Sequence, residues 1–310
     1  MKRVLVTGAS GCIGRQAVPA LVARGWDVHA VSSRQHDDLA PAAAWHVADL
    51  LDGASVKSLV QSVRPTHLLH LAWSIPPGKW ATAPENVQWV EASVNLSRRF
   101  AEHGGERFVG AGSCLEYDWN YGYCTERLTP RKPQTIYGVC KNAVYEVVSA
   151  FGAVAGFTTA WGRIFFLYGP YEHPDRLVAS VIRSLIAGEP ARCSHGNQIR
   201  DYLYAADVAD ALVTLLESDA QGAVNIGSGQ PVALKDLVMR IGQALGRADL
   251  IQLGAIPAAA TDTPLVVANV DRLRNEIRWT PRHSLDAGLE ATIAWWRARR
   301  KRAATVGPRL

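Results

Sequence analysis

Residues 4–15 read VLVTGASGCIGR, and this stretch decides the fold of the chain. An apolar run is followed by three glycines in the spacing G-x-x-G-x-x-G, and a helical pattern begins directly after them. Gly8 allows a tight turn, Gly11 allows a pyrophosphate to approach the backbone, and Gly14 allows the helix to pack against the strand. The N-terminus of that helix offers N–H groups and a partial positive charge to phosphate oxygens. The stretch predicts a strand, a phosphate-binding turn and a helix; the alternative is an ordinary strand–helix turn.

Short apolar runs and helical patterns alternate through the first 170 residues. The expected strands cover residues 4–7, 28–32, 44–47, 67–72, 107–111 and 159–166. The expected helices cover residues 14–24, 55–63, 84–102 and 137–150. Strands separated by helices in this way predict right-handed βαβ units and a parallel sheet covered by helices on both faces.

After residue 170 the pattern becomes less regular. Helices are expected at 177–187, 207–218, 234–245 and 285–301, with strands just after residue 190 and at 223–226, and an irregular segment at 250–283. The fold class is therefore α/β, with a Rossmann-type doubly wound parallel sheet and a smaller C-terminal α/β substrate-binding domain. The expected division is residues 1–170, with 200–228 returning to the first domain, and 171–310. We expect the substrate in the crevice between the two parts.

The composition is that of a globular protein. The chain has 310 residues, of which 48% are hydrophobic and 20% charged, and no apolar stretch approaches the roughly 18 residues of a membrane span. The five cysteines are scattered and form no C-x-x-C pair, so we expect neither disulfides nor a metal site, and a cytoplasmic location.

The net charge is +5, and much of the excess lies in residues 297–302. Such a basic end is compatible with nucleic-acid binding, but cations also favour the last turns of a helix. We expect the second explanation, with no nucleic-acid or membrane partner.

Tyr137 and Lys141 form the pattern Y-x-x-x-K at the start of an expected helix, where they lie one turn apart on one face. A neighbouring ammonium group lowers the pKa of a phenol and equips it for proton transfer. Ser113 follows the strand expected at 107–111, at the edge where a parallel sheet presents its reactive groups. Its hydroxyl either bonds a substrate oxygen or only caps the turn.

Further motifs occur in order along almost the whole chain: His70-Leu71-Ala72, Tyr168-Gly169-Pro170, Arg200-Asp201-Tyr202, Asp207-Val208-Ala209 and Asn225-Ile226-Gly227. Together with the glycine turn, Ser113, Tyr137 and Lys141, they make the chain resemble an extended short-chain dehydrogenase/reductase. More narrowly, it resembles the nucleotide-sugar epimerase, dehydratase and reductase group.

The resemblance implies a catalytic set and two binding sets. The catalytic residues would be Ser113, Tyr137 and Lys141. The cofactor would be bound by Gly8, Ser10, Gly11, Cys12, Ile13, Gly14, Ser33, Arg34, Asp49, Leu50, Leu71, Ala72, Tyr137 and Lys141. A nucleotide-sugar substrate would be bound by Trp73, Ser113, His173, Arg176 and Arg200, with Tyr171 and Glu172 beside them. The resemblance also implies a homodimer built from a helix bundle.

Two of these residues have simpler explanations. Asp49, which would contact the adenine, is also suited to capping a loop. Arg200, which would pair with the substrate diphosphate, has Asp201 and Asp207 nearby in the sequence as ion-pair partners.

The end of the second expected strand departs from the pattern of NAD-dependent relatives. Those relatives carry an acidic residue there, whereas this chain reads Val31-Ser32-Ser33-Arg34. An arginine with two hydroxyls suits a 2′-phosphate, which favours NADP(H) over NAD. The alternative is an exposed loop arginine.

The segment after Ser113 departs from the dehydratases. They carry an Asp-Glu pair where this chain has Cys114 and Leu115, and Glu116 comes one place too late. Dehydration is therefore disfavoured. Trp89 also replaces an asparagine of the relatives, which removes a helix–strand hydrogen bond that the asparagine would make.

These features predict NADPH-dependent reduction of a nucleotide-linked 4-keto-6-deoxy sugar. An alternative is an NAD(P)-dependent nucleotide-sugar 4-epimerase, which would use the same residues. A catalytically silent dinucleotide sensor is a third hypothesis, which the presence of Ser113, Tyr137 and Lys141 disfavours.

Overall fold

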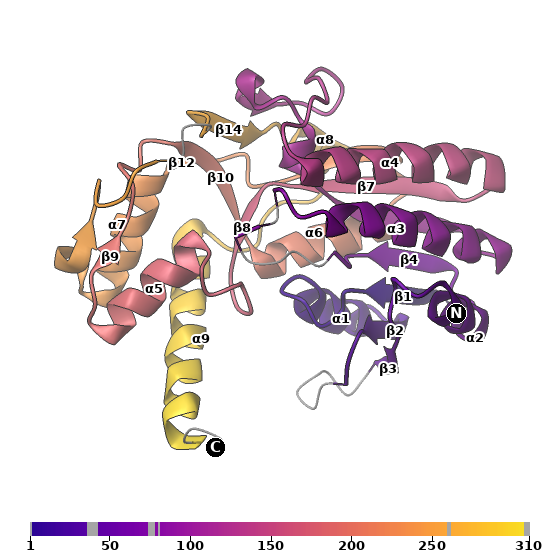
Figure 1. The fold of residues 1–310 in the computed structure, drawn as a ribbon, viewed down its shortest axis with the longest axis horizontal. Coiled ribbons are helices and arrows are strands. Elements are labelled where there is room, and N and C mark those ends of the chain that lie inside the picture. Colours follow the sequence, from indigo (N-terminus) through magenta and orange to yellow (C-terminus); the bar gives the residue numbers. More distant parts are fainter. Residues whose placement is uncertain (1, 36–42, 74–77, 80, 259–261, 307–310) are drawn as a thin grey trace.

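A computed structural model describes residues 2–35, 43–73, 78–79, 81–258 and 262–306 (Figure 1). Its larger part is a seven-stranded sheet whose neighbouring strands are all parallel, in the order β11-β7-β5-β4-β1-β2-β3. These strands are β1 (Arg3–Thr7), β2 (Asp27–Ser32), β3 (Ala44–Val47), β4 (His67–His70), β5 (Arg107–Ser113), β7 (Thr158–Ile164) and β11 (Gly222–Ile226). The central strands are buried almost throughout, as continuous apolar runs predict.

Helices cover both faces of this sheet. On one face α1 (Gly14–Ala23) packs beside α6 (Ala205–Glu217), and their apolar residues share one core with the strands. On the other face lie α2 (Gly53–Val63), α3 (Glu85–Glu102) and α4 (Ile136–Ala155), which share a second core. The doubly wound fold predicted from the sequence is confirmed.

A smaller sheet gathers short strands from distant parts of the chain. Its order is β12-β10-β14-β6, and β8 also pairs with β10. The strands are β6 (Tyr123–Cys124), β8 (Phe166–Tyr168), β10 (Ile199–Tyr204), β12 (Pro231–Ala233) and β14 (Leu265–Ala268). The helices α5 (Leu177–Ala187), α7 (Leu234–Leu245) and α9 (Leu285–Val306) bury a third core beside it.

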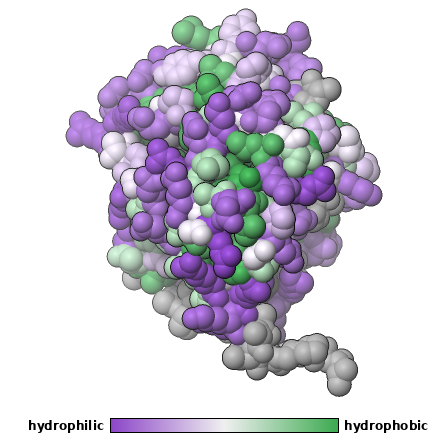
Figure 2. Space-filling view, turned by 90° about the vertical axis from the view of Figure 1, so that its left-hand side faces the viewer, coloured by the Kyte–Doolittle hydropathy of each residue, from purple (hydrophilic) through white to green (hydrophobic). Residues whose placement is uncertain are grey.

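The remaining elements are small. They are α8 (Asp271–Asn275), the paired strands β9 (Ala191–Arg192) and β13 (Ile251–Gln252), and short 3₁₀ turns at Cys114–Glu116, Trp119–Tyr121 and Ala248–Leu250. Helix α9 extends away from both sheets (Figure 1). The face at the α5–α7 end is largely hydrophilic, with apolar side chains gathered near its centre (Figure 2).

The strand expected at 159–166 is in fact two strands in different sheets. The break lies at Phe165, whose N–H donates to the Ile226 carbonyl of the large sheet at 3.0 Å, while Phe166 already pairs with β10. Similarly, residues 200–204 lie in the small sheet, so the part of the 200–228 segment that returns to the large sheet comprises α6 and β11.

Several expected bounds were wrong, among them those of β5, which ends at Ser113 rather than residue 111, and of α4, which ends at Ala155 rather than residue 150. The segment 250–283 is not irregular throughout, because it contains β14 and α8. Helix α9 continues to residue 306, and β4 ends at His70 rather than at residue 72. Among the described residues, no helix is long and apolar enough to cross a membrane, and no three His, Cys, Asp or Glu side chains are grouped for a metal ion.

Candidate active site

The glycine turn lies at the carboxyl edge of the large sheet, between the ends of β1 and β4. Gly8 has a φ of +66°, and a Cβ there would lie 2.7 Å from the Ala72 nitrogen. A Cβ on Gly14 would lie 2.4 Å from the Gly8 carbonyl oxygen, so α1 starts directly against the turn. Gly11 is exposed, and the N-cap residue Ile13 makes no side-chain cap to the helix. The N–H groups of Gly11, Arg15 and Gln16 donate to carbonyls of the turn itself, so Cys12, Ile13 and Gly14 offer the N–H groups for a phosphate, which fits a dinucleotide cofactor.

A buried chain of hydrogen bonds holds β4 against this turn. Ser93 of α3 donates its hydroxyl proton to the Trp89 carbonyl at 2.6 Å, so His70 Nε2 must be the donor in its 2.9 Å bond to Ser93 Oγ. His70 Nδ1 then accepts from Thr7 Oγ1 at 2.8 Å, and Thr7 accepts from the Ala72 N–H at 3.3 Å. Burial lowers the pKa of His70 to about 3, which keeps the ring neutral.

These hydrogen bonds show how α3 is joined to β4 although Trp89 stands where the relatives carry an asparagine. The indole cannot replace the asparagine amide, but Ser93 makes a helix–strand hydrogen bond one turn further on. Trp89 instead stacks on Trp73, with ring centroids 6.1 Å apart. Sequence reasoning missed His70 and Ser93 as a pair, because 23 residues separate them and neither stands in a local polar pattern.

Ser113 ends β5 and begins a 3₁₀ turn. Its Oγ accepts from the Leu115 N–H at 3.2 Å, and its own N–H donates to Glu116 Oε1 at 2.8 Å. The serine does cap the turn, as one explanation of the sequence held. Its hydroxyl also forms a hydrogen bond to Tyr137 that lowers the pKa of the phenol.

Tyr137 and Lys141 lie on the first turns of α4, whose N-cap Thr135 accepts from the Gly138 N–H at 3.1 Å. Lys141 is buried and donates from Nζ to the Ala111 carbonyl at 2.8 Å. Its ammonium also lies 4.0 Å from the ring centroid of Trp73 and 5.9 Å from that of Tyr137. The two catalytic candidates therefore meet the end of β5 and Trp73 at one edge.

The sequence predicted a lowered pKa for Tyr137, and this prediction is wrong. Burial raises the pKa of the Tyr137 phenol, the charge of Glu116 raises it further, and the hydrogen bond from Ser113 and the charge of Arg176 lower it by less. The ammonium of Lys141 is bonded away toward Ala111, and burial lowers its pKa to about 7. Tyr137 is thus a protonated phenol, which suits a proton donor.

An ion pair that the sequence analysis did not identify lies beneath these residues. Arg163 Nε donates to Glu116 Oε2 at 2.7 Å, and both side chains are completely buried. Glu116 also accepts from the Trp161 indole N–H at 2.9 Å. The pattern Ser113-x-x-Glu116 is that of a capping box, and this local signal predicts the turn although not the arginine, which lies 47 residues away.

The cofactor candidates after β2 lie beside the glycine turn. Ser10 and Ser32 share a hydrogen bond of 3.1 Å, and Ser33 and Arg34 follow as exposed residues. Asp49 is exposed and accepts from the Leu51 N–H at 2.9 Å, so it does cap its loop.

The remaining cofactor candidates line the same edge. Leu50 and Ala72 are buried, whereas Leu71 and Cys12 are half-buried. Cys12 donates to the Pro170 carbonyl at 3.3 Å, and burial raises the pKa of its thiol to about 12. The thiol thus joins the glycine turn to the Tyr-Gly-Pro turn.

The substrate candidates after Pro170 are partly exposed. His173 and Arg176 lie on the surface before α5, and the charge of Arg176 acts on both Tyr137 and Glu172. Glu172 is buried, which raises the pKa of its carboxyl to about 8. Tyr171 has a φ of +66° and lies between Arg15, 4.5 Å from its ring centroid, and the indole of Trp295.

Arg200 has a different ion-pair partner from those expected. It is buried and pairs with Asp262, while its guanidinium lies over the rings of Trp119 and Phe166. Asp207 pairs instead with His283, and among the described residues the Asp201 carboxylate accepts from backbone N–H groups and from the Ser228 hydroxyl. Neither Asp201 nor Asp207 is therefore free for Arg200.

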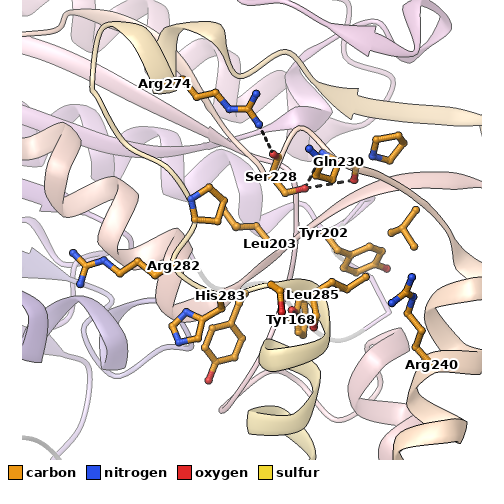
Figure 3. Close-up of a pocket in the computed structure, with 15 residues that line it drawn as sticks. Tyr168, Tyr202, Leu203, Ser228, Gln230, Arg240, Arg274, Arg282, His283 and Leu285 are labelled. Carbon is orange, nitrogen blue, oxygen red and sulfur yellow. Dashed lines mark hydrogen bonds between the residues drawn. The ribbon is translucent and has the colours of Figure 1, made fainter.

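A cavity of about 470 Å³ lies elsewhere, between β10, the start of β12 and the segment before α9 (Figure 3). It is lined by tyrosines and by Arg240, Arg274 and Arg282, and none of the predicted catalytic or substrate residues borders it. Arg274 is bonded to the Ser228 carbonyl there. This cavity is not the site that Ser113, Tyr137 and Lys141 form.

The model of the NAD dependent epimerase/dehydratase family matches residues 4–227, which include the glycine turn and all three catalytic candidates. The chain belongs to this family. It is an enzyme of the extended short-chain dehydrogenase/reductase type, and the family works with NAD or NADP.

The similar proteins include a dTDP-glucose dehydratase and a UDP-glucose epimerase. The chain is 28% identical to a dTDP-glucose 4,6-dehydratase of Xanthomonas campestris pv. campestris, over 94% of this chain and 92% of the relative. It is 25% identical to the UDP-glucose 4-epimerase of Thermus thermophilus in complex with NAD, with a TM-score of 0.85 over 95% and 99% of the two chains. It is 30% identical to MoeE5 in complex with UDP-glucose and NAD, with a TM-score of 0.83 over 97% and 100%.

Proposed function

We propose that the enzyme reduces a nucleotide-linked 4-keto-6-deoxy sugar with NADPH. Two observations support this proposal together. Ser113, Tyr137 and Lys141 lie at one edge of the large sheet, and residues 33–35 after β2 include an arginine and no carboxylate. Cys114 and Leu115 occupy the places of the dehydratase acid and base, and both side chains are incapable of that proton transfer.

Each of the three residues has a separate role in the reduction of the carbonyl group. When bound, NADPH supplies the hydride that reduces the C4 carbonyl carbon. Tyr137 donates its phenolic proton to the O4 oxygen, so the ketone becomes an alcohol. Ser113 donates a hydrogen bond to the same oxygen and stabilises its developing negative charge. Lys141 holds the ribose hydroxyls of the nicotinamide half.

The substrate is held by the second part of the chain. Arg176 is exposed close enough to Tyr137 for its charge to act on the phenol, and we assign it to the substrate diphosphate. Arg200 serves the same anion only if its pair with Asp262 opens or is shared. Trp73, in edge contact with Tyr137 at 6.0 Å between centroids, narrows the sugar site.

The experiment is a comparison of cofactors and sugars. Purified enzyme is mixed with NADPH or NADH and with 4-keto-6-deoxyhexoses carried on dTDP, GDP, CDP or UDP, and absorbance at ~340 nm is followed. We expect stoichiometric NADPH oxidation with one nucleotide. Arg34→Ala should weaken NADPH about tenfold in kcat/KM and leave NADH unchanged, because one charge-assisted contact is removed. NADPH that is not consumed with any keto sugar contradicts the proposal.

A 4-epimerase is the second candidate, and the NAD-bound relatives support it. An epimerase oxidises and then re-reduces one carbon, so its cofactor is regenerated and stays bound. Interconversion of a nucleotide hexose and its C4 epimer without added cofactor, by enzyme that retains NAD after purification, would favour this function over the reductase.

We further propose a homodimer through α3 and α4. These helices pack side by side on one face of the large sheet, and Val87, Val139 and Val147 are exposed on them. Light scattering after size-exclusion chromatography should give twice the 33.6 kDa chain mass, and Val147→Glu should give the single mass.

A further inference from the structure

We propose that Glu116 is a positioning residue for Lys141: its buried carboxylate is the anion that keeps this lysine in the ammonium form in which it binds the cofactor. The inference rests on cofactor binding alone and not on the ketoreductase proposal.

Glu116 and Lys141 reach the end of β5 two residues apart. Lys141 Nζ donates to the Ala111 carbonyl at 2.8 Å, and Glu116 Oε1 accepts from the Ser113 N–H at 2.8 Å. A Cβ on Gly112 between them would lie 2.1 Å from Trp161 Nε1 and 2.6 Å from Glu116 Oε1, so the glycine allows the indole and the carboxylate to approach the strand. The geometry therefore brings a carboxylate to the strand end that the ammonium also contacts.

The other groups around Lys141 offer no negative charge. His70 on β4 is neutral, Tyr137 on the same helix is a protonated phenol, and Trp73 offers only its ring face. Within the described residues, no ion pair involving Lys141 is formed at 4.0 Å or less. Of the carboxylates in the described part of the chain, Glu116 is the one whose charge acts on Lys141, and it opposes the effect of burial.

Arg163 explains how a carboxylate is kept at this depth. Its Nε bonds Glu116 Oε2, and its Nη1 donates to the Tyr117 hydroxyl at 3.1 Å. Tyr117 in turn donates to Asn225 Oδ1 at 2.7 Å. The guanidinium lies on the side of Glu116 away from the Ser113 bond, so it pays part of the desolvation cost of the carboxylate and leaves Oε1 directed at β5.

Cofactor binding is linked to the protonation state of Lys141. An ammonium group donates to ribose hydroxyls and also attracts an anionic dinucleotide. A neutral amine no longer attracts the anion. Affinity for the cofactor should be constant below the pKa of Lys141, which is about 7, and should fall as the pH rises above it. Removing the carboxylate should move this fall to lower pH, because the ammonium loses its anion.

The test measures the dissociation constant of NADP⁺, or of NAD⁺ if it binds more tightly, from pH 5 to 9 by quenching of tryptophan fluorescence. The key variant is Glu116→Gln with Arg163→Met, which removes both buried charges while the amide oxygen still accepts from Ser113. Arg163→Met alone keeps the carboxylate, and Lys141→Met is the control that retains every other titration, including that of the 2′-phosphate. Circular dichroism confirms that each variant is folded.

We expect a pH-dependent loss of affinity in the wild type that Lys141→Met abolishes. In the double variant its midpoint should lie about one pH unit lower than in the wild type. Arg163→Met, if it folds, should move the midpoint up or leave it in place. A midpoint in the double variant within ~0.3 of the wild-type value, or a wild-type affinity with no step that depends on Lys141, would overturn the inference.

Discussion

The two sheets of this enzyme are built in opposite ways. The strands of the large sheet are all parallel, single helices join β1 to β2 and β4 to β5, and its central strands β1, β4 and β5 are buried almost throughout. The small sheet pairs strands of two to six residues drawn from positions between 123 and 268, and the buried carboxylate of Asp201 accepts from backbone N–H groups there. The difference teaches that the catalytic edge is specified by local motifs, whereas the substrate side depends on contacts between distant segments.

The largest expected effect tests whether the chemistry belongs to the large sheet. Tyr137→Phe should lower kcat by ~10³-fold, because it removes the proton donor. Cofactor affinity and melting temperature should change little, since the ring packing is retained. Steady-state NADPH oxidation and a thermal melt provide the measurements. A variant that keeps more than a tenth of the wild-type kcat would move the chemistry away from this edge.

The second test breaks the small sheet at its centre. Asp201 is fully buried and accepts from the N–H groups of Ser228, Gly229 and Ala268, so it joins β10 to β14 and to the turn after β11. Asp201→Asn should lower the free energy of unfolding by about 3 kcal/mol, since the amide places a donor against donors.

Asp286→Asn is the matched control for that experiment. Its partner Arg240 is solvent-exposed, and such pairs contribute no more than about 1 kcal/mol. Urea unfolding measures both variants. Equal losses in the two would show that the small sheet does not depend on its buried carboxylate.

The third test applies to the turn of the large sheet. Gly14→Ala would place a Cβ 2.4 Å from the Gly8 carbonyl oxygen, so α1 must move away from the phosphate-binding turn. We expect the cofactor dissociation constant to rise about a hundredfold, since the backbone contacts to the pyrophosphate depend on that position. Gly53→Ala, where the nearest atom is 3.6 Å away, should leave it unchanged. Fluorescence titration with the cofactor distinguishes the two.

Between pH 7 and pH 5, the smallest effect is a pH dependence of stability that originates in the large sheet. His70 has a pKa of about 3 in the folded protein and an ordinary value near 6.5 when unfolded. The folded state is therefore stabilised above pH 6.5, and this contribution is lost as the pH falls toward 3, by up to about 1.4 kcal/mol per pH unit.

His70→Gln should remove this part of the slope. Urea unfolding at pH 7, 6 and 5 measures it, and the other histidines contribute equally in both proteins. If the variant and the wild type lose stability in parallel between pH 7 and pH 5, the buried neutral imidazole is not the source.

How far the sequence could predict the structure follows the same division. Helices α5 and α7 begin and end where expected, because apolar periodicity and a following glycine mark each end locally. Strand β14 was missed, because its four residues lie in a proline-rich segment and gain their order only from β10 and β6. The prediction of a single strand at 159–166 was wrong for a similar reason. The residues of β7 and β8 are mostly apolar in both sheets, so the sequence does not show where one strand ends and the other begins.

The sequence by itself determined the glycine turn, the alternation of strands and helices, the family, and the placing of Tyr137 and Lys141 one helical turn apart. Each of these depends on neighbours within a few residues, where backbone geometry leaves little choice. Tertiary structure alone decided that Arg200 meets Asp262 across 62 residues and that Arg163 meets Glu116 across 47. The sequence shows the sign of each charged residue but not its ion-pair partner, because the partner depends on which segments the folded chain buries together.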